Sequence, residues 1–170
     1  MSATHLTHFF LFKIPHSGYF SPEAIATALS TLTSLLRLHL EFKSPRSLPD
    51  GESRHPPLLT RSVLLALNGL SFQGVGEYLE DLVALIDVPL RYFLDITMFN
   101  QILFGTPQFI QFISRTPKLK AHKKACLVFN DDTAAVVLSS PNGTGYEKLK
   151  VGILCRESDW QVSSLEQVCN

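Results

Sequence analysis

The feature of this sequence that most constrains its fold is a recurring leucine motif. Three segments repeat the spacing L-x-x-L-x-L, in which x is variable and phenylalanine replaces leucine at some positions; they begin at Leu6, Leu35 and Leu67. A short unit of this kind cannot bury its apolar face alone, so neighbouring units must stack against one another. The motif therefore predicts one continuous stack of strands.

The second apolar position of each copy defines the period of the repeat. Phe9, Leu38 and Leu70 lie about 30 residues apart, and Leu94 follows after about 24, near the range of leucine-rich repeats. We expect each of these four segments to form one strand of a parallel ladder.

Two later copies of the motif are degraded. Leu149 lies about 55 residues beyond Leu94, which leaves room for one further unit of the usual length. The segment from Cys126 to Val128 is the candidate for that unit, although it lacks a clear upstream apolar partner. Its strand is expected in the ladder between those of Leu94 and Leu149.

The segments between the strands show helical periodicity. Ser21, Pro22 and Glu23 supply an N-cap hydroxyl, a first-turn proline and a first-turn acid, which predicts a helix over residues 22–36. Three more helices are predicted by apolar side chains at helical spacing or by a capping box. They are one after Gly76 (Tyr78, Leu79, Leu82, Val83, Ile86), one after Thr106 and Pro107 (Phe109, Ile110, Phe112, Ile113), and a last one that opens at the capping box Ser163–Glu166.

Together these patterns predict an α/β fold. It is an irregular leucine-rich-repeat solenoid over residues 1–170, with a parallel strand ladder on the concave face and helices on the convex face. We interpret it as a fragment of a longer solenoid without polar capping units, so exposed apolar strand edges and aggregation are expected. The segment 43–57, rich in proline, serine and charge, is predicted to be an exposed loop.

Composition and motifs exclude several classes of function. Hydrophobic residues make up 45% of the chain and charged residues 18%, which is typical of a globular protein. The 15 basic and 15 acidic side chains balance, so neither nucleic acid nor a membrane surface is expected as a partner. The sequence shows no signal peptide, membrane-spanning stretch, metal-spaced cysteine pair or catalytic motif. We expect an intracellular protein, cytoplasmic or nuclear, that is not an enzyme and holds no cofactor or metal.

Three local clusters have both a functional and a structural interpretation, and the structural one is favoured. Asp131 and Asp132 are typical of a turn at a strand end rather than of a cation site. The lysines at positions 118, 120, 123 and 124 have no interleaved aromatic residues, which favours a solvated loop over a nucleic-acid patch. Trp160 is expected to pack beneath the last helix rather than to serve as an exposed anchor.

The candidate binding surface follows from the alternation of strand side chains. Residues that flank the repeat leucines point to the opposite face from the leucines, so we expect them on the concave surface. Their mixed charge and aromatic end suit a protein partner. The candidates are, unit by unit, His8, Phe10 and Phe12; Arg37, His39 and Glu41; Ser71 and Gln73; Asp95 and Thr97; and Lys148 and Lys150.

Four runs of the sequence form a distinctive series. They are residues 57–67 (PLLTRSVLLAL), 74–90 (GVGEYLEDLVALIDVPL), 109–117 (FIQFISRTP) and 158–165 (SDWQVSSL). The series, which spans most of the chain, resembles the carboxyl-terminal leucine-rich-repeat region of F-box proteins from mushroom-forming fungi, the basidiomycetes. In that family the repeats select the targets of a cullin-type ubiquitin ligase. The resemblance thus implies a module for substrate recognition, whose protein target the sequence does not identify.

The same family docks on the ligase adaptor through an amino-terminal F-box. This sequence opens inside a repeat at Leu6, so we expect no binding to the adaptor. The alternative hypothesis is a truncated paralogue or gene fragment without an independent function, and an in-frame F-box in the upstream genomic sequence would argue against it. A small hydrolase with an unfamiliar site is a third hypothesis, for which an activity screen is expected to find nothing.

Overall fold

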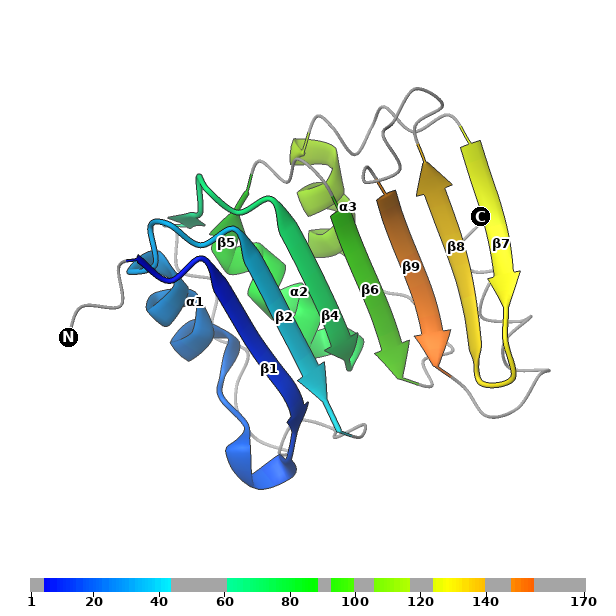
Figure 1. The fold of residues 1–170 in the computed structure, drawn as a ribbon, viewed down its shortest axis with the longest axis horizontal. Coiled ribbons are helices and arrows are strands. Elements are labelled where there is room, and N and C mark those ends of the chain that lie inside the picture. The colour runs from blue at the N-terminus through cyan, green and yellow to red at the C-terminus, as the bar shows by residue number, and fades with distance from the viewer. Residues whose placement is uncertain are drawn as a thin grey trace.

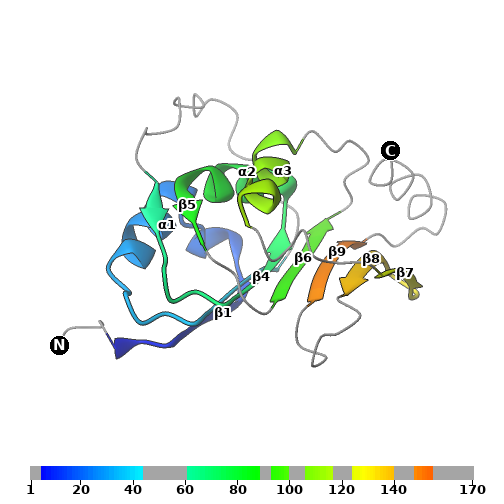
Figure 2. The ribbon, with the colours of Figure 1, turned by 90° about the horizontal axis from the view of Figure 1, so that it is seen from above.

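The structure is a computed structural model in which the described residues are 5–43, 61–88, 93–99, 106–116, 124–139 and 148–154. These residues form a mixed α/β fold, as the sequence predicts. An open seven-stranded sheet carries three α-helices on one face, and no described helix lies on the other face (Figures 1 and 2).

Strands and helices are interspersed along the first two thirds of the chain, and three strands follow. The elements are β1 (His8–Ile14), a 3₁₀ helix (His16–Gly18), α1 (Pro22–Ser30), β2 (Arg37–Phe42), β3 (Ser62–Val63), β4 (Gly69–Gly74), α2 (Gly76–Leu85), β5 (Ile86–Asp87), β6 (Phe93–Phe99), α3 (Pro107–Arg115), β7 (Lys124–Phe129), β8 (Thr133–Ser139) and β9 (Lys148–Leu154).

The large sheet has the strand order β1-β2-β4-β6-β9-β8-β7, and its first five strands run parallel. The second apolar position of five of the six predicted repeats lies in one row across those five strands. Phe9 pairs with Leu38, Leu38 with Leu70, Leu70 with Leu94, and Leu94 with Leu149. The predicted ladder of these five segments is confirmed, with the same residues in register.

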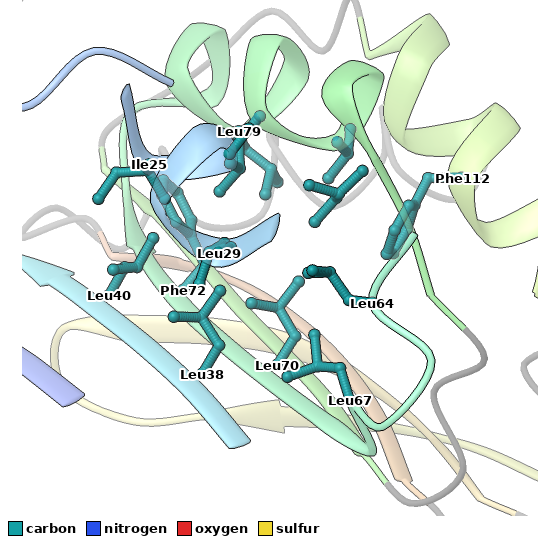
Figure 3. Packing of buried hydrophobic residues seen from close by; sticks show 14 of the residues in the cluster. Ile25, Leu29, Leu38, Leu40, Leu64, Leu67, Leu70, Phe72, Leu79 and Phe112 are labelled. Atoms are coloured by element: carbon teal, nitrogen blue, oxygen red, sulfur yellow. The ribbon is translucent and has the colours of Figure 1, made fainter. Parts of the chain in front are cut away.

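The core lies between the parallel strands and the helices. Leu38 and Phe72 are 1% exposed and Leu70 is fully buried, and all three point toward the helix layer (Figure 3). Leu29 of α1 and Leu79 of α2, both fully buried, meet them from the other side. Because alternate strand residues face the helices, one apolar face of each strand suffices to build this core.

An aromatic cluster closes one end of the core. Tyr78 of α2 lies with its ring centroid 4.8 Å from that of Phe42 and 5.9 Å from that of Phe72, and Tyr19 approaches it edge-on at 5.5 Å. Burial raises the pKa of Tyr78 well above its ordinary value. The hydroxyl therefore stays protonated at physiological pH, and the residue acts here as packing.

The helices α2 and α3 are joined by charged side chains rather than by apolar contact alone. The two carboxylate oxygens of Glu80 on α2 accept hydrogen bonds from the backbone N–H groups of Gln108 and Phe109, each at 2.8 Å. Arg115, at the other end of α3, donates to the Val83 carbonyl at 3.3 Å and pairs with Asp87 at 3.1 Å. Each end of α3 is thus fixed to the α2 segment.

The prediction for the segment from Cys126 to Val128 is wrong. This segment is a strand, β7, but it lies at the outer end of the sheet and pairs antiparallel with β8. Between β6 and β9 the described residues form α3 and the hairpin of β7 and β8, and β9 pairs directly with β6. The turn predicted at Asp131 and Asp132 is confirmed, since it joins β7 to β8.

The first helix is shorter than the predicted range 22–36, because it ends at Ser30. The Ser30 hydroxyl donates to the Thr27 carbonyl and the Thr31 hydroxyl to the Ala28 carbonyl, both at 2.7 Å. These side-chain bonds satisfy the last carbonyls of the helix and favour its termination. The remaining residues turn toward β2 and still bury Leu35.

The other predicted helices agree with the structure where it describes them. The helix after Gly76 is α2, but it ends at Leu85, and Ile86 of its predicted apolar stripe lies in β5 instead. The helix after Thr106 is α3, although Ile110 of its predicted apolar stripe is 61% exposed. Nearly all of the predicted loop 43–57, the lysines before position 124, Trp160 and the capping box at 163–166 lie outside the described residues.

Candidate functional site

The predicted binding residues lie on the face of the sheet opposite the helices. Leu38 and Leu40 of β2 point toward the helices, so the alternate residues of that strand point away (Figure 3). The register joins such residues into rows across the strands, and these rows together with Phe12 are called the open face. The rows are His8, Arg37, Gly69, Phe93 and Lys148; Phe10, His39, Ser71, Asp95 and Lys150; and Glu41, Gln73 and Thr97.

The members of the open face differ in accessibility. Phe10 and Phe12 are 46% and 61% exposed, whereas Thr97 is buried and offers little surface for a partner. The side chain of Lys148 lies outside the described residues. Phe93 was not among the predicted residues, although the alternation that selected Asp95 places it on the same face.

Aromatic rings gather at the β1 end of the open face. The ring centroid of Phe12 lies 4.4 Å from that of His39, and Phe10 meets the same imidazole edge-on at 6.1 Å. His8 contacts Phe10 in turn at 5.7 Å. The register of β1 shifts after Leu11, so Phe12 lies in an irregular part of the strand. Exposed aromatic rings of this kind are the usual anchors of protein interfaces.

Charged side chains of both signs occupy the middle of the open face. Asp95 and Lys150 form an ion pair at 3.4 Å, and His39 contacts Glu41 at 3.5 Å. Accessible pairs of this kind contribute little to stability because water screens them. They place opposite charges side by side on the open face.

A glycine creates room for a ring between two of the strands. Gly69 pairs with Arg37 on one side and with Phe93 on the other. The Phe93 ring lies in the space above Gly69, so close that a Cβ built there would be 2.3 Å from Cε1 of the ring. The Arg37 guanidinium lies over the same ring, 5.8 Å from its centroid. Arg37 and Phe93 thus form a cation–π platform at the centre of the row.

Gly69→Ala is expected to displace the Phe93 ring and to remove the contact of that ring with Arg37. The loss of the cation–π contact is worth about 0.5 to 1 kcal/mol, so the fold should persist. The change is measurable as loss of the ring-current shift of the Arg37 side-chain protons in NMR spectra. Ser71→Ala, on the same strand and face, should leave those signals in place. Unchanged Arg37 signals in Gly69→Ala would contradict the described platform.

The described residues give no metal site or membrane helix. Within the described ranges, no group of three or more His, Cys, Asp or Glu side chains is arranged to hold a metal ion. None of the helices in the same ranges is long and apolar enough to cross a membrane. The open face thus offers aromatic rings, a cation over a ring and paired charges, which are contacts suited to recognition.

Comparison of the chain with protein-family models, with curated proteins and with solved structures gives no significant match.

Proposed function

We propose that this chain is a protein-interaction module built of irregular leucine-rich repeats. It would resemble the target-selecting repeats of basidiomycete F-box proteins and bind its partner through the open face. The observation that carries this proposal is the single row formed by Phe9, Leu38, Leu70, Leu94 and Leu149. A row of equivalent apolar residues, one from each strand, is what stacked repeat units require.

The backbone contacts that begin successive strands also support a repeated unit. The N–H groups of Leu36 and Arg37 both donate to the Thr7 carbonyl, at 2.8 and 3.1 Å. One strand further, the N–H groups of Asn68 and Gly69 both donate to the Leu36 carbonyl, at 2.9 and 3.1 Å. The same paired bond thus recurs at the same position of two successive units.

The chemistry of the open face favours a protein as the partner. Nucleic acid needs a surface of mostly positive charge. On the open face, by contrast, Lys150 pairs with Asp95, and Glu41 lies on the same strand as Arg37. Protein interfaces combine exposed aromatic rings with arginine and a polar surround. The aromatic residues at the β1 end of the open face, Phe12 among them, supply the rings.

Replacing Arg37, His39 and Glu41 together by alanine is expected to abolish partner capture without unfolding the chain. All three side chains lie outside the core, so their loss should not unfold the chain. Loss of a central cluster of contact residues commonly costs more than about 2 kcal/mol of binding free energy, which lowers the affinity about thirtyfold. A photo-crosslinking residue at Ser71 would first identify the captured protein, and its affinity for wild type and variant would then be measured by calorimetry.

The matched control carries three substitutions on the helix layer, at the exposed positions Thr27, Gln111 and Ser114. Circular dichroism should show the same content of strand and helix in both variants. Equal affinity of the open-face variant and the control would contradict the proposal. The same photo-crosslinking residue at Thr27, on the helix layer, serves as the control for crosslinking at Ser71. If no protein crosslinks at Ser71 alone, the alternative of a gene fragment without its own function is favoured.

A further inference from the structure

The outermost strand of the sheet, β7, has an accessible edge. β8 is its one strand partner among the described residues, and β7 is drawn at the end of the sheet in Figure 1. All six of its residues are exposed, with Leu127 at 54% and Phe129 at 52%. No described helix covers this end (Figure 2). Such an apolar edge is a template for pairing with another strand.

The hairpin geometry shows which backbone groups point to that edge. The Asn130 N–H donates to the Thr133 carbonyl at 2.8 Å, so this pair closes the hairpin with a hydrogen bond. Hydrogen-bonded and non-hydrogen-bonded pairs alternate along an antiparallel ladder. The N–H and carbonyl groups of Ala125, Leu127 and Phe129 are therefore directed away from β8, toward the outer edge.

The opposite edge of the sheet, β1, is less suited to strand addition. Its register with β2 shifts between Leu11 and Ile14, and Lys13 has a positive φ of 52°. A bulge on an edge strand is a known means by which proteins prevent edge-to-edge pairing. β7 has no such irregularity in its pairing with β8. The two edges are thus unequal.

We propose that β7 pairs with the β7 of a second copy of this chain, antiparallel and around a two-fold axis. In such a pair Leu127 lies opposite the second copy's Leu127, and Ala125 lies opposite Phe129. These are the residues whose backbone groups point outward, so the register uses every outward group of the strand. A small residue opposite a large one also lets the side chains pack without a clash.

The charges at the two ends of β7 are complementary in the same register. Lys124 begins the strand, and the carboxylates of Asp131 and Asp132 follow its end in an exposed turn. Antiparallel pairing brings Lys124 of each copy beside the Asp131–Asp132 turn of the other. A two-fold pair also closes on itself, so it covers both β7 edges without continuing into a fibre. The open face of β1, β2, β4, β6 and β9 is not part of this pairing.

Sedimentation equilibrium of the full chain at protein concentrations of about 1 to 100 µM tests this pairing. An interface smaller than the standard size is expected to have a dissociation constant within this range. The wild type should pass from monomer to dimer across this range. Leu127→Lys places two like charges directly opposite each other and should weaken the dimer at least about tenfold. Ile110→Lys is the matched control, since Ile110 on α3 is 61% exposed and lies outside the pairing. It should leave the dimer unchanged.

Charge variants test the register. Lys124→Glu should weaken the dimer, and adding Asp132→Lys to it should restore much of the lost affinity. A wild type that stays monomeric, a dimer insensitive to Leu127→Lys, or assembly beyond the dimer would each overturn the proposal. Circular dichroism of each variant separates weakened pairing from unfolding, since position 127 is half-exposed and a lysine there should not disturb the monomer.

Discussion

Replacing Leu70 by alanine is expected to lower the free energy of unfolding by about 2 to 5 kcal/mol. Leu70 is fully buried in β4, the middle one of the five parallel strands, between Leu38 and Leu94 of its row. The shorter side chain would leave a cavity beneath the helices, with no neighbouring strand free to move into it. Because a domain of this kind has about 5 to 15 kcal/mol of stability in total, the loss is a large fraction of it.

Urea unfolding followed by circular dichroism measures this loss, and Leu65→Ala is the matched control. Leu65 is the same residue type five positions earlier, yet it is 78% exposed. Its replacement should change the free energy of unfolding by less than about 0.5 kcal/mol. Equal effects of the two substitutions would mean that Leu70 does not lie in the core.

Glu80→Ala is expected to lower the free energy of unfolding by about 1 to 3 kcal/mol. Thr106, the N-cap residue of α3, makes no side-chain capping bond. The Glu80 carboxylate performs that role from the neighbouring helix, by accepting from Gln108 and Phe109. Without it, two backbone N–H groups at the start of α3 lose their partners. Gln111→Ala, at an exposed position of α3, is the control, and a cost no larger than that of the control would contradict the assigned role.

The stability cost of Glu80→Ala should also depend on pH. Burial raises the pKa of Glu80, and this effect exceeds the opposing one of its two backbone hydrogen bonds. A carboxyl whose pKa is raised by folding contributes stability that is fully present below its unfolded pKa and is lost as pH rises through the folded pKa. The difference between wild type and Glu80→Ala should therefore be larger at about pH 4 than at neutral pH. A difference that grows toward neutral pH would contradict the raised pKa.

The parallel ladder could be predicted because its signal is local. Each strand carries apolar residues at alternate positions, as at Leu38 and Leu40, and this alternation selects both the buried row and the opposite face. The same rule placed His39 and Asp95 on the open face. The alternation does not indicate how exposed a side chain is on its face. Thr97 is therefore buried on a face that was predicted to be accessible.

The position of β7 could not be predicted from that signal. Its six residues are all exposed, so no alternation distinguishes a ladder strand from the edge of a hairpin. The useful signal is the pair of strand-forming runs that flank Asp131 and Asp132, since a short turn between two such runs indicates a hairpin. The capping of α3 by Glu80 could not be predicted from the sequence either, because it joins residues that lie 28 and 29 positions apart in the chain.

Contacts between leucine methyl groups test the central claim most directly, namely that the leucine segments form one ladder beneath the helices. In NOE spectra of a leucine-labelled chain, Leu38 should contact Leu70, and Leu70 should contact Leu94. Because β8 and β9 lie between β7 and β6, Leu127 and Leu94 should share no contact. An NOE between Leu127 and Leu94, together with none between Leu38 and Leu70, would contradict the described order of the strands.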